Sequence, residues 1–187
     1  MITDHSLLTK MSGSKNILAI SGSLRKGSSN HNILRFLGTI MPADFDYAIY
    51  DGLAQLPHFD PGFDNDNPPA QVTEFRELLN AADGIIICTP EYAFGVPGSL
   101  KNALDWTVSS GSLDNKKVAL ITASTGGQNA HAAMLLILGA LNAELSPDAT
   151  LLIPFIRAKM DSEGNITAVE TIESLKTTLQ NLITRIA

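Results

Sequence analysis

Cysteine, long apolar runs and positive charge are all scarce in this sequence. It contains one cysteine in 187 residues, which excludes an intramolecular disulfide and a cysteine-rich zinc site. No apolar run approaches the roughly 20 residues of a membrane-spanning helix. Aspartate and glutamate outnumber lysine and arginine by 19 to 13, for a net charge of −6. Because phosphate backbones are bound by clusters of basic residues, nucleic acid is not expected as the main partner.

The rest of the composition is that of an ordinary globular protein. Hydrophobic residues make up 44% of the chain and charged residues 17%, and a chain of 187 residues can form one domain with a full core. The first residues lack the basic and apolar segments of a secretory signal. We therefore expect a flexible N-terminal extension over residues 1–15, a single domain over residues 16–187 and a cytoplasmic location.

Apolar periodicity predicts strands and helices that alternate along the chain. Short apolar or β-branched runs are typical of strands, and apolar residues spaced three and four apart are typical of helices. Strands are expected at residues 17–20, 45–50, 85–88, 118–121 and 149–153, and helices at 31–41, 72–79, 100–106, 128–142 and 169–186. This alternation predicts an α/β fold, a doubly wound parallel sheet of five strands with helices on both faces.

The loop at residues 22–30, after the first predicted strand, has the composition of an anion site. It offers the hydroxyls of Ser23, Ser28 and Ser29 among small residues, and Arg25 supplies a planar cation. The start of the following helix adds partial positive charge, so phosphate suits all of these features. The loop is also explained as a simple Gly/Ser-rich turn in which Ser28 or Ser29 is the helix N-cap.

Two more loops of unusual composition, residues 89–98 and 123–127, also follow predicted strands, and the first carries two aromatics that we expect to be exposed. Ligands of doubly wound sheets bind at this edge, so the coincidence of three such loops favours phosphate. A Walker A loop would need lysine in place of Ser28, and a dinucleotide fingerprint would need glycine in place of Leu24. A monophosphate held by hydroxyls and Arg25 without a metal fits better, and flavin mononucleotide (FMN) is such a ligand.

Metal ligation is not predicted. The run at residues 64–67 is followed by Pro69 and Phe75 where a calcium-binding loop needs glycine and glutamate. The four histidines are dispersed, and His131 is interpreted as a solvated helix residue. The single cysteine, Cys88, ends a predicted buried strand and is interpreted as a structural thiol.

Two segments together resemble the NADPH-dependent FMN reductase family. They are residues 22–30, Gly-Ser-Leu-Arg-Lys-Gly-Ser-Ser-Asn, and Pro90-Glu91-Tyr92 running into residues 97–106, within a similarity over roughly residues 16–156. The resemblance implies a flavodoxin-like fold, FMN as cofactor and NADPH or NADH as co-substrate. It also implies a homodimer or homotetramer, with the helix that holds Trp106 and the loop at residues 51–69 as interface elements.

The resemblance further implies which residues bind the cofactor. The first loop would hold the phosphate, the second would border the isoalloxazine, and the third would contact its polar edge. In that order, the expected residues are Ser23, Arg25, Ser28, Ser29 and Asn30, then Pro90, Glu91, Tyr92 and Ala93, and finally Ser124, Thr125, Gly126 and Gly127. Ala93 departs from the family, which usually has asparagine there, so this chain lacks a side-chain amide at that position.

The expected reaction is hydride transfer from NAD(P)H to FMN, followed by electron transfer to a flavin, quinone or similar small acceptor. No side chain is predicted as a catalytic acid or base, because the cofactor carries the chemistry. Glu91 could brace its loop or contact flavin or nicotinamide, and Trp106 is better explained by packing on the sheet or on a second subunit. A non-enzymatic FMN electron carrier and a relative without flavin are the alternatives.

Overall fold

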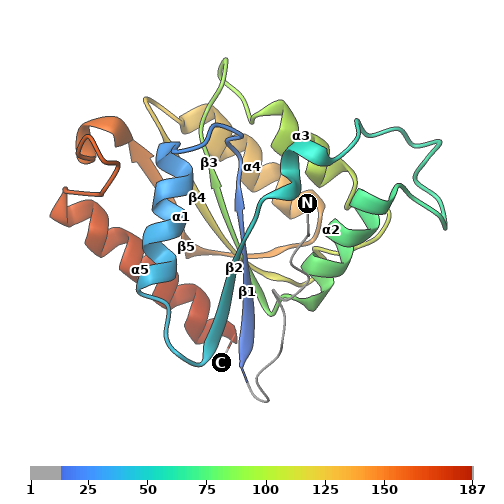
Figure 1. The fold of residues 1–187 in the computed structure, drawn as a ribbon, viewed down its shortest axis with the longest axis horizontal. Coiled ribbons are helices and arrows are strands. Elements are labelled where there is room, and N and C mark those ends of the chain that lie inside the picture. Colours follow the sequence, from blue (N-terminus) through green and yellow to red (C-terminus); the bar gives the residue numbers. More distant parts are fainter. Residues whose placement is uncertain (1–13, 187) are drawn as a thin grey trace.

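A parallel sheet of five strands, in the order β2-β1-β3-β4-β5, forms the centre of the molecule (Figure 1). The computed structural model describes residues 14–186, so the predicted N-terminal extension lies almost wholly outside the described residues. The strands are β1 (Lys15–Ser21), β2 (Phe45–Tyr50), β3 (Gly84–Thr89), β4 (Lys117–Ser124) and β5 (Glu144–Pro154). Each adjacent pair is parallel, which confirms the predicted doubly wound α/β fold.

Helices cover both faces of the sheet. One face carries α1 (Ser29–Thr39) and α5 (Val169–Ile186), and the other carries α2 (Ala70–Ala81), α3 (Gly98–Asp105) and α4 (Gln128–Ala140). Two 3-10 helices, η2 (Gly52–Gln55) and η3 (Ile156–Lys159), follow β2 and β5. Within residues 14–186, none of these helices has the length and hydropathy needed to cross a membrane.

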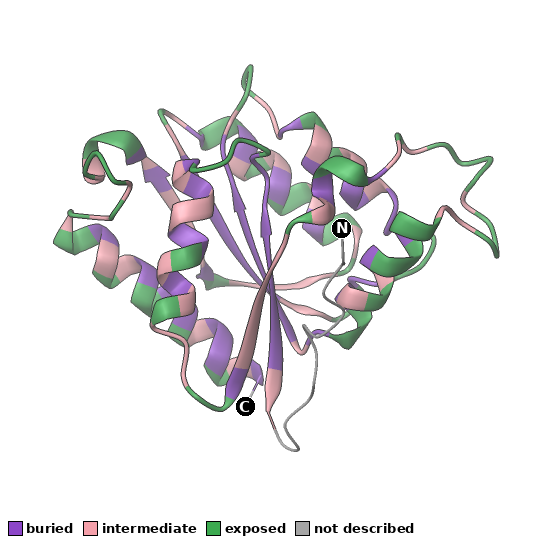
Figure 2. Ribbon diagram, viewed as in Figure 1, coloured by how far each residue is buried: buried purple, intermediate pink, exposed green. Residues whose placement is uncertain are grey.

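The central strand β3 is buried along its whole length (Figure 2). It lies between β1 and β4 and has helices over both faces, so side chains of either orientation are covered. Ile86 and Cys88 pack on the side of α1 and α5, whereas Ile85 and Ile87 pack on the side of α2, α3 and α4. An unbroken apolar run is therefore the pattern that this position requires.

The loop after β2 packs against the end of α3. Trp106 is fully buried, its indole N–H donates to the Pro57 carbonyl at 2.9 Å, and its ring meets Phe59 edge-on with centroids 5.0 Å apart. The Asn102 amide holds the same segment, donating to the Pro57 carbonyl and accepting the Phe59 backbone N–H. Trp106 thus packs within its own chain, and its ring is not available to a second subunit.

Candidate functional site

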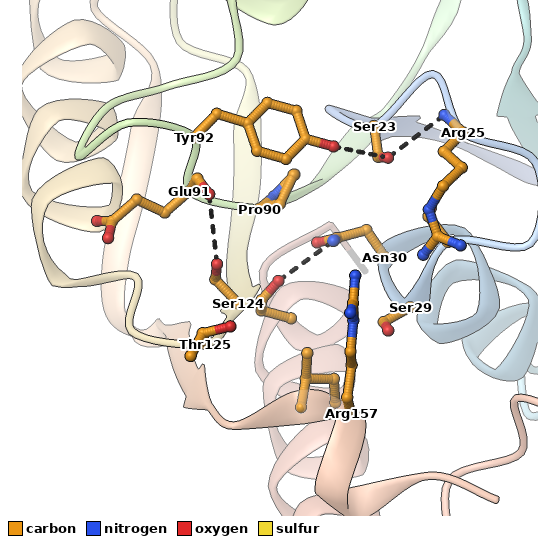
Figure 3. A pocket seen from close by; sticks show the side chains of 13 residues that line it. Ser23, Arg25, Ser29, Asn30, Pro90, Glu91, Tyr92, Ser124, Thr125 and Arg157 are labelled. Atoms are coloured by element: carbon orange, nitrogen blue, oxygen red, sulfur yellow. Dashed lines mark hydrogen bonds between the residues drawn. The ribbon is translucent and has the colours of Figure 1, made fainter.

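The carboxyl ends of the strands surround a pocket at one edge of the sheet (Figure 3). It has a volume of about 150 Å³ and is partly open to solvent. Its lining comes from the loops after β1 and β3, the end of β4, and η3. The lining residues are Ser23, Arg25, Ser28, Ser29, Asn30, Pro90, Glu91, Tyr92, Ala123, Ser124, Thr125, Ile156 and Arg157.

The loop between β1 and α1 contributes hydroxyls and a cation. Ser28 is the N-cap of α1, since its hydroxyl accepts the backbone N–H of His31 at 3.1 Å. Ser23 Oγ lies 3.3 Å from the Tyr92 hydroxyl and accepts the Arg25 backbone N–H at 3.4 Å, which ties this loop to the loop after β3. Within residues 14–186, the Arg25 guanidinium forms no ion pair. The N-cap interpretation is therefore confirmed for Ser28. Because its guanidinium has no ion-pair partner in these residues, Arg25 is able to bind an anion.

Asn30 lies in the floor of the pocket and is almost fully buried. Its Nδ2 donates to the Ala123 carbonyl at 3.2 Å, and its Oδ1 accepts the Cys88 thiol at 3.3 Å. The amide thus joins the start of α1 to the ends of β3 and β4. Burial raises the pKa of the Cys88 thiol, in agreement with the predicted structural role. A phosphate contact from Asn30 stays a prediction.

The loop after β3 ends in a tight turn at residues 92–95. Tyr92 and Gly95 exchange backbone hydrogen bonds of 3.0 Å in both directions. Between them, Ala93 and Phe94 have φ angles of 48° and 60°, the left-handed pattern of type I′ turns. Tyr92 and Phe94 are exposed, as predicted, with fractions of 53% and 81%. Ala93 lies at the tip of this turn, outside the pocket lining.

Glu91 directs its carboxylate toward the start of α4, away from Arg25 and Arg157 (Figure 3). Its Oε2 accepts the backbone N–H of Ala130 at 2.9 Å. The first backbone N–H groups of a helix lack partners within the helix, and Gly127 at the N-cap of α4 has no side chain to bind them. The contact supports the bracing role among the two alternatives predicted for Glu91.

His131 is not the solvated residue that we predicted. Its Nδ1 lies 2.9 Å from the Thr122 hydroxyl, because the first turn of α4 places the imidazole against this buried residue of β4. This partial burial lowers the pKa of His131. His131 is thus only partly solvated, and the sequence did not reveal its partner because Thr122 comes from the strand that precedes the helix.

Only part of the third predicted loop, residues 123–127, lines the pocket. Ser124 and Thr125 line the pocket, and the Ser124 hydroxyl donates to the Glu91 carbonyl at 3.5 Å. Gly126 and Gly127 lie outside the lining. Gly127 has a φ of 109°, and a Cβ there would approach a Leu152 methyl group to 2.9 Å, so only glycine suits this N-cap. Cofactor contacts from the two glycines stay predictions.

Sequence reasoning missed three lining residues, Ala123, Ile156 and Arg157. Arg157 follows β5, the fifth strand whose carboxyl end lies at this edge, but no motif marks it. That position after a strand is the one signal that could have found it. Among residues 14–186, no group of acidic, histidine or cysteine side chains is placed to bind a metal.

This chain is similar in sequence to known quinone reductases and to a family of FMN reductases. A family model described as NADPH-dependent FMN reductase matches residues 15–157. The quinone reductase of Escherichia coli K12 is 38% identical over 119 residues, which are 62% of this chain and 63% of that protein, so this chain spans less than two thirds of the relative. The 2-hydroxy-1,4-benzoquinone reductase of Burkholderia sp is 31% identical over 167 residues, covering 86% and 90% of the two chains.

Solved structures show the same fold. FerB, a flavoenzyme NAD(P)H:(acceptor) oxidoreductase from Paracoccus denitrificans, superposes with a TM-score of 0.80 at 24% sequence identity. The superposition covers 92% of this chain and 97% of FerB. A WrbA-like flavodoxin from Agrobacterium tumefaciens superposes with a TM-score of 0.61, covering 92% and 98% of the two chains at 18% identity. These similarities identify the fold as flavodoxin-like, as expected.

Proposed function

The chain belongs to the NADPH-dependent FMN reductase family, and from this membership we propose that its pocket binds FMN and that the protein is an NAD(P)H-dependent oxidoreductase. The observation that carries the proposal is the pocket at the carboxyl ends of the strands, which has a cationic, hydroxyl-rich end and an aromatic end. Ten of the thirteen expected cofactor-binding residues line it.

The cationic end has the donor set of a phosphate site. The Arg25 guanidinium has no ion-pair partner in residues 14–186, and the N-terminus of the 11-residue helix α1 lines this end through Ser29 and Asn30. The protein as a whole carries a net charge of −6, so a local group of donors is needed to attract an anion. We propose that Ser23, Arg25, Ser28, Ser29 and Asn30 hold the FMN phosphate, and that Ser28 and Asn30 also set the shape of the loop and floor.

The other end suits a flat ring with polar edges. Pro90 and Tyr92 present apolar surface, and Ser124 and Thr125 present hydroxyls and backbone groups on the opposite side of the opening (Figure 3). The hydrogen bond between Ser23 and Tyr92 connects the two ends and fixes their spacing. We propose that these residues border the isoalloxazine, together with Gly126 and Gly127 and the backbone of Glu91 and Ala93.

The chemistry that FMN supplies when bound is acceptance of a hydride from NAD(P)H and delivery of electrons to an acceptor. The residues of this chain would bind and orient the reactants. The Glu91 carboxylate is directed to the start of α4 and His131 lies outside the pocket lining, so neither is assigned as an acid or base. We propose that the contribution of the protein is to position the reactants.

The proposed acceptor is a quinone or a flavin. Two of the relatives are named for the reduction of quinones. The opening of the pocket toward solvent and the exposed rings of Tyr92 and Phe94 offer apolar surface to such flat molecules.

We further propose a homodimer or homotetramer in the cytoplasm, formed by the single domain at residues 16–187. The outer face of α4 supports an interface, because Leu135 and Leu136 are exposed by 39% and 76% among small residues. Light scattering should give an oligomer for the natural protein and a smaller species for Leu136→Lys, and an unchanged mass would remove α4 from the interface. Cell fractionation tests the location.

The proposed activity is tested by loading the purified protein with FMN and measuring NADPH and NADH oxidation with a free quinone and no protein partner. We expect a protein-bound flavin spectrum and turnover with quinone. Flavin binding without reduction by NAD(P)H would indicate an electron carrier, and absence of flavin binding would indicate a relative that has lost its cofactor.

A further inference from the structure

Arg157 brings a second guanidinium to the phosphate end of the pocket. Figure 3 shows its side chain rising from η3 toward Asn30 and the start of α1, where the Arg25 guanidinium is also directed. The two arginines come from loops at opposite ends of the chain, after β1 and after β5. Ser29 lies between them in this view.

The backbone after β5 holds Arg157 in this place. Phe155 has a φ of 54°, a left-handed conformation that is rare for a bulky residue, and its N–H donates to the Thr125 carbonyl at 3.2 Å. The chain thereby turns sharply into η3, where Ile156 is buried in the core. The Lys159 carbonyl then accepts the Thr167 N–H at 2.9 Å, which secures the far end of η3. Strained conformations of this kind persist where the surrounding structure requires them, often at functional sites.

The charge of Arg157 is not compensated within the described part of the chain. Arg76 and Arg185 are bound by the carboxylates of Asp64 and Glu144, but Arg157 has no ion pair or side-chain hydrogen bond in residues 14–186. The one acidic residue in the pocket lining, Glu91, points to α4. The pocket therefore presents two unpaired arginines in a protein whose net charge is −6.

Resting on the proposed function, we propose that Arg157 is the second arginine of the FMN phosphate site and binds the phosphate from the side opposite Arg25. A phosphate monoester carries about −1.5 to −2 charges near pH 7, so one arginine neutralises it only in part and two match it. Each planar guanidinium can donate two parallel hydrogen bonds to phosphate oxygens. Arg157 would then make the site select FMN over riboflavin, which has the same ring system without the phosphate.

The test is the affinity for FMN and for riboflavin of the natural protein, Arg157→Ala, Arg157→Lys and the control Arg35→Ala. Arg35 is an exposed arginine of α1 that lies outside the pocket and has no ion pair in the described residues. We expect Arg157→Ala to weaken FMN binding by about 10- to 100-fold and Arg157→Lys by less, because lysine keeps the charge but not the planar fork. Riboflavin affinity should be unchanged, and Arg35→Ala should match the natural protein.

Four results would overturn the inference in different ways. Equal FMN affinity of Arg157→Ala and the natural protein would remove Arg157 from the site and leave the proposed function standing. Equal losses for FMN and riboflavin would indicate a structural role of η3. If Arg157→Ala kept the FMN affinity of the natural protein and lowered kcat/KM for NADPH but not for NADH, Arg157 would be assigned to the NADPH phosphate. If the natural protein binds neither flavin, the proposed function and this inference both fail.

Discussion

The Glu91 carboxylate accepts the backbone N–H of Ala130 at 2.9 Å, so the loop after β3 caps the helix that follows β4. The contact braces the loop that forms one wall of the pocket against α4. Removing a side-chain cap costs about 0.5–2 kcal/mol, and the charge at a helix N-terminus contributes part of it. We expect Glu91→Ala to lower the free energy of unfolding by about 1 kcal/mol and Glu91→Gln by less, as measured by urea denaturation.

An exposed glutamate on α5 provides the control for this measurement. Within residues 14–186, the Glu173 carboxylate forms an ion pair with Lys176 alone, at the surface, so Glu173→Ala should change stability little. If Glu91→Gln kept full stability but slowed reduction by NADPH, Glu91 would contact flavin or nicotinamide instead of bracing its loop.

Ala93 has a φ of 48° at the tip of the turn after β3, where the side chain of alanine gives no compensation for a left-handed backbone. Asparagine and glycine are favoured in such turns. We expect Ala93→Asn to raise the free energy of unfolding by about 0.5–1 kcal/mol. The β-branched variant Ala93→Val should lower it. Thermal unfolding of both variants checks this, and equal midpoints for all three proteins would contradict it.

His131 predicts a pH dependence of stability. Partial burial against Thr122 lowers its pKa below the ordinary value of 6.5. The unfolded state therefore binds a proton to His131 more readily than the folded state. The stability that neutral His131 contributes to the folded state is present above about pH 6.5 and is lost as the pH falls through the lowered pKa. In denaturation experiments, the stability of the natural protein relative to His131→Gln should decrease from about pH 7.5 to about pH 5. A constant difference would show that His131 has the same pKa in both states.

The spacing of apolar residues predicted the helices and strands, because that spacing shows which face of each element is buried. Ile33, Leu34 and Leu37 have helical spacing, and all three are buried in α1. The start of β5 was not predicted, because Pro147 and the exposed Asp148 interrupt its apolar pattern. An edge strand tolerates both, and here the pairing with β4 shifts register between Val118 and Leu120.

The sequence predicted those pocket residues that lie in loops of unusual composition directly after a predicted strand, such as Ser23, Arg25 and Tyr92. Contacts between segments that are distant in the chain could not be predicted from the sequence. The cap from Glu91 joins residues 39 positions apart, and no local pattern signals it. Arg157 likewise depends on a left-handed turn at Phe155, a residue that does not favour that conformation.

Titration of FMN into the natural protein and into Arg25→Ala tests the central claim most directly, namely that this pocket binds FMN through its phosphate. We expect the natural protein to bind FMN and Arg25→Ala to bind it more weakly by about 1–3 kcal/mol, because a charge-assisted contact to phosphate is lost. Equal affinities in the two proteins, or no FMN binding by the natural protein, would contradict the claim.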